Sequence, residues 1–378
     1  MLSEYNFRDY NFKILLSVLA LNGVGLMVIN SAVGGDRSYM NRQLIGLFGG
    51  LMIAIILSLI SYRFILRFSV LIYLACIGIL AAVIVMGQLG GSGTGSQRWI
   101  ELPVLGRLQP SEFVKIGLIA FFSWFLQRNQ ERIDQPLILI LIAGLAGVPL
   151  LLIMKQPDLS TSIVIMVFIL CLIYIAGISY KWIIGALSVG VPGIVTIVYL
   201  AQHNMVPFLR PYQVNRILAF INPEKYADLD LQQKNSEMAI GSGQLYGKGL
   251  FNDTAISVKN GNFLSEEHTD FIFSVLGEQF GLMGCLIVLG LYFLFLWRAM
   301  EIAKMYSHPF VTLVTSGVCA IFFFHITVNI AMTIGLMPVT GLPLPFLSYG
   351  GFFAMTCMFL VGLLCNMRLP GYKMKGRN

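Results

Sequence analysis

Charged residues are scarce in this sequence. Only 11% of its 378 residues are Asp, Glu, Lys or Arg, whereas 57% are hydrophobic, and soluble domains usually carry about 25% charged residues. This composition excludes an ordinary soluble domain and predicts a polytopic membrane protein. The net charge of +7 is consistent with that class, because membrane proteins concentrate Lys and Arg in cytoplasmic loops. We therefore expect no nucleic-acid partner.

Several common site signatures are also missing. The six cysteines (76, 171, 285, 319, 357 and 365) lie in apolar stretches and form no Cys-x-x-Cys pair, so buried, unreactive thiols are expected. The four histidines (203, 268, 308 and 325) are scattered, which gives little support to a histidine-based metal site. The Gly-rich stretch "AIGSGQLYGKG" lacks Walker spacing and follows no strand, so it does not indicate nucleotide binding. We read it as a turn.

What the chain does have is a series of long apolar runs. A bilayer crossing needs about 20 mostly apolar residues, and ten such segments are present, at about 13–32, 43–61, 67–87, 112–127, 136–154, 160–178, 182–201, 270–298, 309–335 and 348–367. The predicted fold is all-α, a single transmembrane bundle over 1–378 with one long extracellular loop, 202–269, between helices 7 and 8. Within that loop "VPFLRPYQVNRILAFI" has the apolar spacing of an amphipathic helix.

Basic residues predict how the chain is oriented. Ten segments put both termini on one side, together with 13 Lys and Arg residues, against five or six in the short loops opposite. Because positive charge collects on the cytoplasmic side, we expect both termini to be cytoplasmic. The long loop carries six basic and seven acidic residues, so it is not a basic arm.

Ionisable residues gather at the segment ends that face outward. Arg107 precedes the fourth segment, Glu112 and Lys115 open it, and Lys155 and Asp158 lie between the fifth and sixth. Intramembrane charges are costly and usually face a bundle interior or a wet cavity. The i, i+3 spacing of Glu112 and Lys115 permits a structural ion pair, and Asp158 has the position of a helix cap; a functional role is the alternative for all three.

The stretch "SEEHTDFIF" (265–273) places a dense ionisable cluster directly before the eighth segment. It contains Glu266, Glu267, His268 and Asp270. Asp270 has the position of a helix cap, but neighbouring charges can tune a carboxylate at a membrane border for proton transfer. We therefore favour a functional role for Asp270. Glu278, eight residues further on, is interpreted as a packing residue, with a functional carboxylate as the alternative.

Five motifs occur in order over nearly the whole chain. They are "RWIELPVLGRLQPSEFVKI", "KQPDLSTS", "AIGSGQLYGKG", "EEHTDFIFSVLGEQFGLMG" and "MPVTGLPLPFLSYGG". Together they resemble the SEDS family (shape, elongation, division and sporulation). The short cytoplasmic start is most similar to the RodA-type elongation branch, and the FtsW- and SpoVE-type branches are the alternatives. Departures from the family pattern occur at Leu264-Ser265, Asn262, Gln244 and Phe352.

The resemblance implies a peptidoglycan glycosyltransferase in the bacterial cytoplasmic membrane, with its active site facing outward. Its substrate would be lipid II, an undecaprenyl-diphosphate-linked disaccharide peptide, and its partner a class B penicillin-binding protein, a transpeptidase. The family's essential aspartate matches Asp270, and its Arg, Glu and Lys match Arg107, Glu112 and Lys115. Asp158, His268 and Ser348 lie within the shared motifs and are candidate substrate-binding residues.

The implied chemistry assigns roles to these groups. A carboxylate can deprotonate the attacking sugar hydroxyl, so Asp270 is the candidate general base. Cations stabilise the departing lipid diphosphate, and the pool of candidates is Arg107, Lys115, Lys155, Arg210, Arg216 and Lys248. The sequence establishes no cofactor, and a divalent cation, Mg or Mn, could replace or assist these cations. A lipid II transporter and a scaffold that only anchors a partner are the alternatives, but transporters favour midplane sites and inverted repeats, and no clear repeat is present.

Overall fold

The structure is a computed structural model. It describes residues 12–60, 62–89, 99–102, 106–203, 210–250, 266–305 and 308–368. Its helices are α1 (Phe12–Ala32), α2 (Arg37–Leu59), α3 (Tyr62–Arg67), α4 (Ser69–Leu89), α5 (Pro110–Arg128), α6 (Pro136–Lys155), α7 (Leu159–Ile175), α8 (Tyr180–Gln202), α9 (Pro211–Ile221), α10 (Ala227–Ser242), α11 (Ile272–Met305), α12 (Pro309–Thr333) and α13 (Gly351–Arg368), with a short 3-10 turn at Gln130–Arg132.

Each predicted apolar segment coincides with one long helix. They are α1, α2, α4, α5, α6, α7, α8, α11, α12 and α13 in chain order. Seven of these, all but α5, α7 and α13, are long and apolar enough by themselves to span a membrane. The chain is therefore an all-helical polytopic membrane protein, as predicted. Among the described residues, β1 (Ile100–Leu102) and β2 (Gly106–Leu108) form a small antiparallel hairpin.

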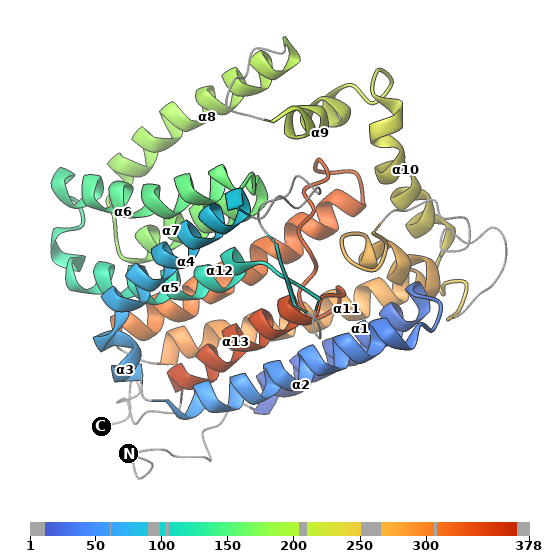
Figure 1. The fold of residues 1–378 in the computed structure, drawn as a ribbon, viewed down its shortest axis with the longest axis horizontal. Coiled ribbons are helices and arrows are strands. Elements are labelled where there is room, and N and C mark those ends of the chain that lie inside the picture. The colour runs from blue at the N-terminus through green and yellow to red at the C-terminus, as the bar shows by residue number, and fades with distance from the viewer. Residues whose placement is uncertain are drawn as a thin grey trace.

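The helix α12 forms the centre of the bundle. Two thirds (67%) of its most apolar stretch is buried, and it contacts α5, α7, α11 and α13. On one side of the bundle α2 lies along α13, and α1 lies along α11 (Figure 1). In contrast, α8 stands at the edge of the bundle (Figure 1), and no residue of its most apolar stretch is buried. All six cysteines are free, and five are buried, as expected.

Between α12 and α13 the chain passes through the protein without regular secondary structure. We call residues 334–350 the linker segment. Non-helical backbone at membrane depth requires partners inside the protein, and here side chains from several helices supply them. Ser160 of α7 donates to the carbonyl of Thr340 at 2.6 Å, Tyr292 of α11 donates to Pro345 O at 2.5 Å, and Gln43 of α2 accepts from Gly350 N at 2.9 Å.

This segment also changes the predicted start of the last helix. The expected boundary was 348, but α13 begins at Gly351. The reason lies in Ser348 and Gly350, because Ser348 Oγ is bonded within the linker segment and Gly350 has φ +150°, a conformation outside the helix. The apolar run in the sequence therefore begins before the helix does.

A break divides α11 at Gly281, which has φ +63° and ψ −164°. Unbroken, its 34 residues would extend about 51 Å, well beyond a hydrocarbon core of about 30 Å. Residues 243–249 satisfy the backbone on both sides of the break. Lys248 N donates to Glu278 O at 2.9 Å, and Leu282 N donates to Gln244 O at 2.8 Å. The Gly-rich turn thus supplies the backbone hydrogen bonds that α11 lacks at its break.

The long loop between α8 and α11 is partly helical. The amphipathic prediction within it is confirmed by α9. The polar helix α10 was not predicted, and it includes the first residues of the stretch interpreted as a Gly-rich turn. Ser236 fixes α10 to the bundle, because its Oγ lies 2.5 Å from Ser274 Oγ and donates to Thr333 O at 2.7 Å. Residues 204–209 and 251–265 of the loop lie outside the described residues.

Candidate active site

Asp270 lies in a tight turn, two residues before the start of α11. Its N–H donates to Glu266 O at 3.2 Å, and its carbonyl accepts from Asn329 Nδ2 at 2.8 Å. Its side chain is partly exposed. The same Asn329 amide donates to Leu342 O at 2.7 Å, so one side chain of α12 holds the Asp270 turn and the linker segment together.

The carboxylate of Asp270 and the guanidinium of Arg216 meet at Gly341. A Cβ built on Gly341 would lie 3.2 Å from Asp270 Oδ2 and 3.6 Å from Arg216 Nη1. Gly341 also has φ +73°, a left-handed conformation that glycine adopts without steric cost. Arg216, exposed on α9, donates through Nη1 to Thr340 O at 3.2 Å. The linker segment therefore brings a carboxylate and a cation from distant parts of the chain to one point.

Ser348 and His268 join the same turn to the linker segment. Ser348 Oγ donates to Thr269 O at 2.6 Å and accepts from Leu344 N at 2.7 Å, and it is buried. The carbonyl of His268 accepts from Tyr349 N at 2.8 Å. Burial lowers the pKa of His268, and the carboxylate of Glu266 partly offsets this. Both residues hold the turn in place, and their contact with substrate stays a prediction.

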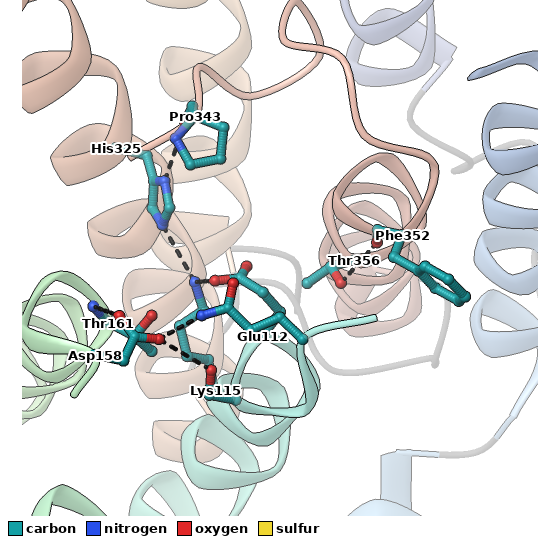
Figure 2. Close-up of polar contacts among 10 residues, drawn as sticks. Glu112, Lys115, Asp158, Thr161, His325, Pro343, Phe352 and Thr356 are labelled. Carbon is teal, nitrogen blue, oxygen red and sulfur yellow. Dashed lines mark hydrogen bonds and ion pairs between the residues drawn. The ribbon is translucent and has the colours of Figure 1, made fainter. Parts of the chain in front are cut away.

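Glu112 and Lys115 form the ion pair that their spacing predicts. Lys115 Nζ lies 2.8 Å from Glu112 Oε1 and only 3.2 Å from His325 Nε2. His325 Nδ1 in turn lies 3.2 Å from Pro343 O in the linker segment, and Figure 2 shows these groups in a chain from α5 to that segment. Lys115 is 1% exposed, so this cation is engaged inside the bundle.

Asp158 caps α7, as its position predicts. Its Oδ1 accepts from Thr161 N at 3.2 Å, as drawn in Figure 2. Its Oδ2 accepts from Gln109 Nε2 and, at 3.3 Å, from Ser111 Oγ. The carboxylate is buried and connects the start of α5 to the start of α7. A role in binding substrate stays a prediction.

The remaining candidate cations are dispersed. Lys248 Nζ pairs with Glu278 Oε1 at 2.8 Å beside the break in α11, which gives the buried Glu278 a structural partner. Lys155 is exposed at the end of α6. Arg210 is exposed at the N-cap of α9, where its N–H donates to Gln213 Oε1 at 3.0 Å. Arg107 belongs to β2, but its side chain lies outside the described residues.

The described part of the chain contains no group of three His, Cys, Asp or Glu side chains placed to bind one metal ion. Mg²⁺ is often held by one or two carboxylates together with substrate phosphates. A divalent cation, Mg or Mn, that assists at the diphosphate therefore stays a prediction.

Two residues of α12 that organise the site were not predicted. His325 and Asn329 lie four positions apart, on one helix face, and both bond to the linker segment. Both are strongly polar residues inside an otherwise mostly apolar run. That is the signal that could have identified them, because buried polar groups need hydrogen-bond partners.

Comparison with known proteins gives a consistent result. A family model described as cell cycle protein, for FtsW, RodA and SpoVE, matches residues 12–370. The chain is 32% identical to the probable peptidoglycan glycosyltransferase FtsW of Trichlorobacter lovleyi, over 96% of this chain and 94% of that protein. It is 35% identical to the peptidoglycan glycosyltransferase MrdB of Escherichia coli K12, over 89% and 87% of the two chains.

A solved structure shares the fold as well. It belongs to work on how a peptidoglycan synthase complex coordinates polymerization and crosslinking, and its chain matches with a TM-score of 0.79 at 27% identity. The match covers 95% of this chain and 97% of that one. The chain therefore belongs to the FtsW/RodA/SpoVE family, the SEDS family that its motifs resemble.

Proposed function

We propose that this protein is a peptidoglycan glycosyltransferase that polymerises lipid II into glycan strands, with Asp270 as its general base. Both relatives described above carry the name peptidoglycan glycosyltransferase and align over most of the chain. The observation that carries the assignment of the base is the meeting of the Asp270 carboxylate and the Arg216 guanidinium at Gly341.

Asp270 suits the attacking hydroxyl of the reaction, and Arg216 suits its leaving group. A sugar hydroxyl attacks an anomeric carbon, a bond to the lipid diphosphate breaks, and the hydroxyl proton must leave. Asp270 accepts that proton, a contribution of about 10²–10⁴-fold in rate. Arg216 neutralises charge on the departing diphosphate.

The other candidate cations differ in availability. Lys115 and Lys248 already bind carboxylates, so we assign them to holding the site together. Lys155 and Arg210 are exposed, and with Arg107 they stay candidates for binding the diphosphate beside Arg216. His268 and Ser348 support the site by fixing the Asp270 turn, and Asp158 does so by connecting the starts of α5 and α7.

Orientation and setting follow from the same proposal. With both termini cytoplasmic, the Asp270 turn faces outward, where glycan strands are assembled. The partner is a class B penicillin-binding protein that crosslinks the strand, consistent with the synthase complex to which the structural relative belongs. We propose a role in cell elongation, with division and sporulation as the alternatives.

The test is polymerisation of lipid II by the purified protein in detergent. Asp270→Asn keeps the shape of the side chain and removes the base, so glycan polymer should fall to background. Glu266→Gln makes the same chemical change in the same turn and should retain activity. Polymer formation by Asp270→Asn at the wild-type rate would disprove the assignment of the base.

The same assay separates the enzyme from the alternative functions. Detergent micelles provide no second compartment, so a lipid II transporter would form no polymer there. A scaffold would form none either and would tolerate Asp270→Asn in cells. Omitting the penicillin-binding protein and then restoring it measures how far polymerisation depends on that partner.

A further inference from the structure

His325 is a buried histidine that the proposed chemistry does not use. It lies within α12, is 1% exposed, and both of its ring nitrogens have partners. Nε2 lies 3.2 Å from Lys115 Nζ, and Nδ1 lies 3.2 Å from Pro343 O. The ring also packs at 5.7 Å between centroids against Phe353 of α13, so its orientation is held from three elements.

The partners determine which nitrogen carries the proton. An ammonium group offers only donors and a carbonyl only acceptors, so Nε2 must accept from Lys115 and Nδ1–H must donate to Pro343. Lys115 donates at the same time to Glu112 Oε1 at 2.8 Å. One carboxylate, one ammonium and one neutral imidazole thus form a charge-balanced chain (Figure 2).

The position of Pro343 makes this chain relevant to Asp270. Asn329, one turn after His325 on α12, holds Leu342 O, and His325 holds the next carbonyl, that of Pro343. Gly341, on which a Cβ would lie 3.2 Å from Asp270 Oδ2, directly precedes this pair. A change in the distance between residues 342–343 and α12 would therefore move the Gly341 backbone that borders the Asp270 carboxylate.

We propose that His325 is a positioning residue, which fixes the linker segment against Asp270 through its bond to Pro343 O. The proposal rests on the proposed function, because it concerns the geometry of the same site. The ion pair of Glu112 and Lys115 acts on the other side of the ring, where it holds the imidazole in the tautomer that donates to Pro343.

Two conservative substitutions test the two hydrogen bonds of the His325 ring one at a time. The amide nitrogen of Asn stands at the same place along the side chain as Nδ1, so His325→Asn can still donate to Pro343 O but cannot reach Lys115. The amide of Gln stands at the place of Nε2, so His325→Gln can accept from Lys115 but leaves Pro343 O without its donor. His325→Leu removes both bonds.

The experiment measures kcat and KM for lipid II polymerisation, together with the thermal unfolding midpoint in detergent. We expect His325→Asn to keep kcat close to wild type. His325→Gln and His325→Leu should lose about 10-fold or more in kcat, because a displaced catalytic group is costly, with KM nearly unchanged. Thr315→Val is the matched control, since Thr315 is buried on α12 and its Oγ1 has no partner among the described residues; it should retain wild-type kcat.

Each outcome decides the question. Equal kcat for the Asn and Gln variants, whether high or low, overturns the proposal, as does wild-type kcat for His325→Gln. If His325→Leu fails to fold, the Asn and Gln pair still decides. A wild-type rate for Asp270→Asn would instead remove the proposed base, whatever the His325 variants show, so the two failures are distinguishable.

Discussion

Substituting Gly341 by Ala should lower polymerisation strongly while leaving the protein folded. At φ +73° the left-handed backbone costs an Ala residue about 1–2 kcal/mol. The new methyl group would lie 3.2 Å from Asp270 Oδ2, closer than an ordinary van der Waals contact, so the carboxylate must move by a few tenths of an ångström. Because displacements of about 1 Å can cost about 10²-fold in rate, we expect kcat to fall about 10-fold or more.

The chain offers a control that carries the same backbone strain without the contact. Gly177, after α7, has φ +97°, and a Cβ there would meet no described atom within 4 Å. Gly177→Ala should therefore lose a similar amount of stability and keep wild-type kcat. Lipid II polymerisation and thermal unfolding in detergent measure the two effects separately. If both variants polymerise at the same rate, the position of the Asp270 carboxylate against Gly341 does not limit catalysis, and the reasoning is refuted.

Three further predictions concern the supports of the site. Lys248→Met removes the ion-pair partner of the buried Glu278 carboxylate and should cost about 3 kcal/mol of stability, seen as a lower unfolding midpoint. The double variant with Glu278→Met should recover much of that loss. An unchanged midpoint for the single variant would contradict the role of the pair. Ser160→Ala removes a hydrogen-bond donor to the linker segment and should lower the free energy of unfolding by about 1 kcal/mol. We expect kcat for polymerisation to change more than KM. An effect on KM alone would contradict a role of Ser160 in positioning the linker segment. The pKa of His268 is lowered in the folded protein, so protonation of this residue favours the unfolded state, and the free energy of unfolding should fall as pH drops below about 6.5. His268→Gln should flatten the dependence of the unfolding midpoint on pH in that range. An unaltered slope would exclude His268 as its source.

The sequence predicted the bundle because membrane helices follow from continuous apolar runs. All ten runs became helices, and the i, i+3 pair of Glu112 and Lys115 and the cap at Asp158 followed from local spacing. These are interactions between residues close in the chain, where helical geometry alone decides which groups meet.

What the sequence could not predict depends on contacts between distant residues. The approach of Arg216 to Asp270 is created by Gly341, and no spacing relates these three positions. Similarly, Lys248 was expected among the phosphate-binding cations, but its ion pair with Glu278 exists because the break at Gly281 draws the 243–249 turn against α11. The sequence of the linker segment is largely apolar, like that of a membrane helix. Its non-helical backbone is explained by hydrogen bonds to side chains of the surrounding helices, which the sequence does not show.

The isolation of α8 has a mechanical consequence. A helix surrounded by protein takes its tilt from its neighbours, but most apolar side chains of α8 are left uncovered by the rest of the described chain. Its 23 residues measure about 34 Å, slightly more than the hydrocarbon core, so the thickness of the bilayer sets its inclination. The helix α9 carries Arg216 and contacts α8. The length of the lipid chains can therefore alter the position of the Arg216 guanidinium beside Asp270 without any change in the protein.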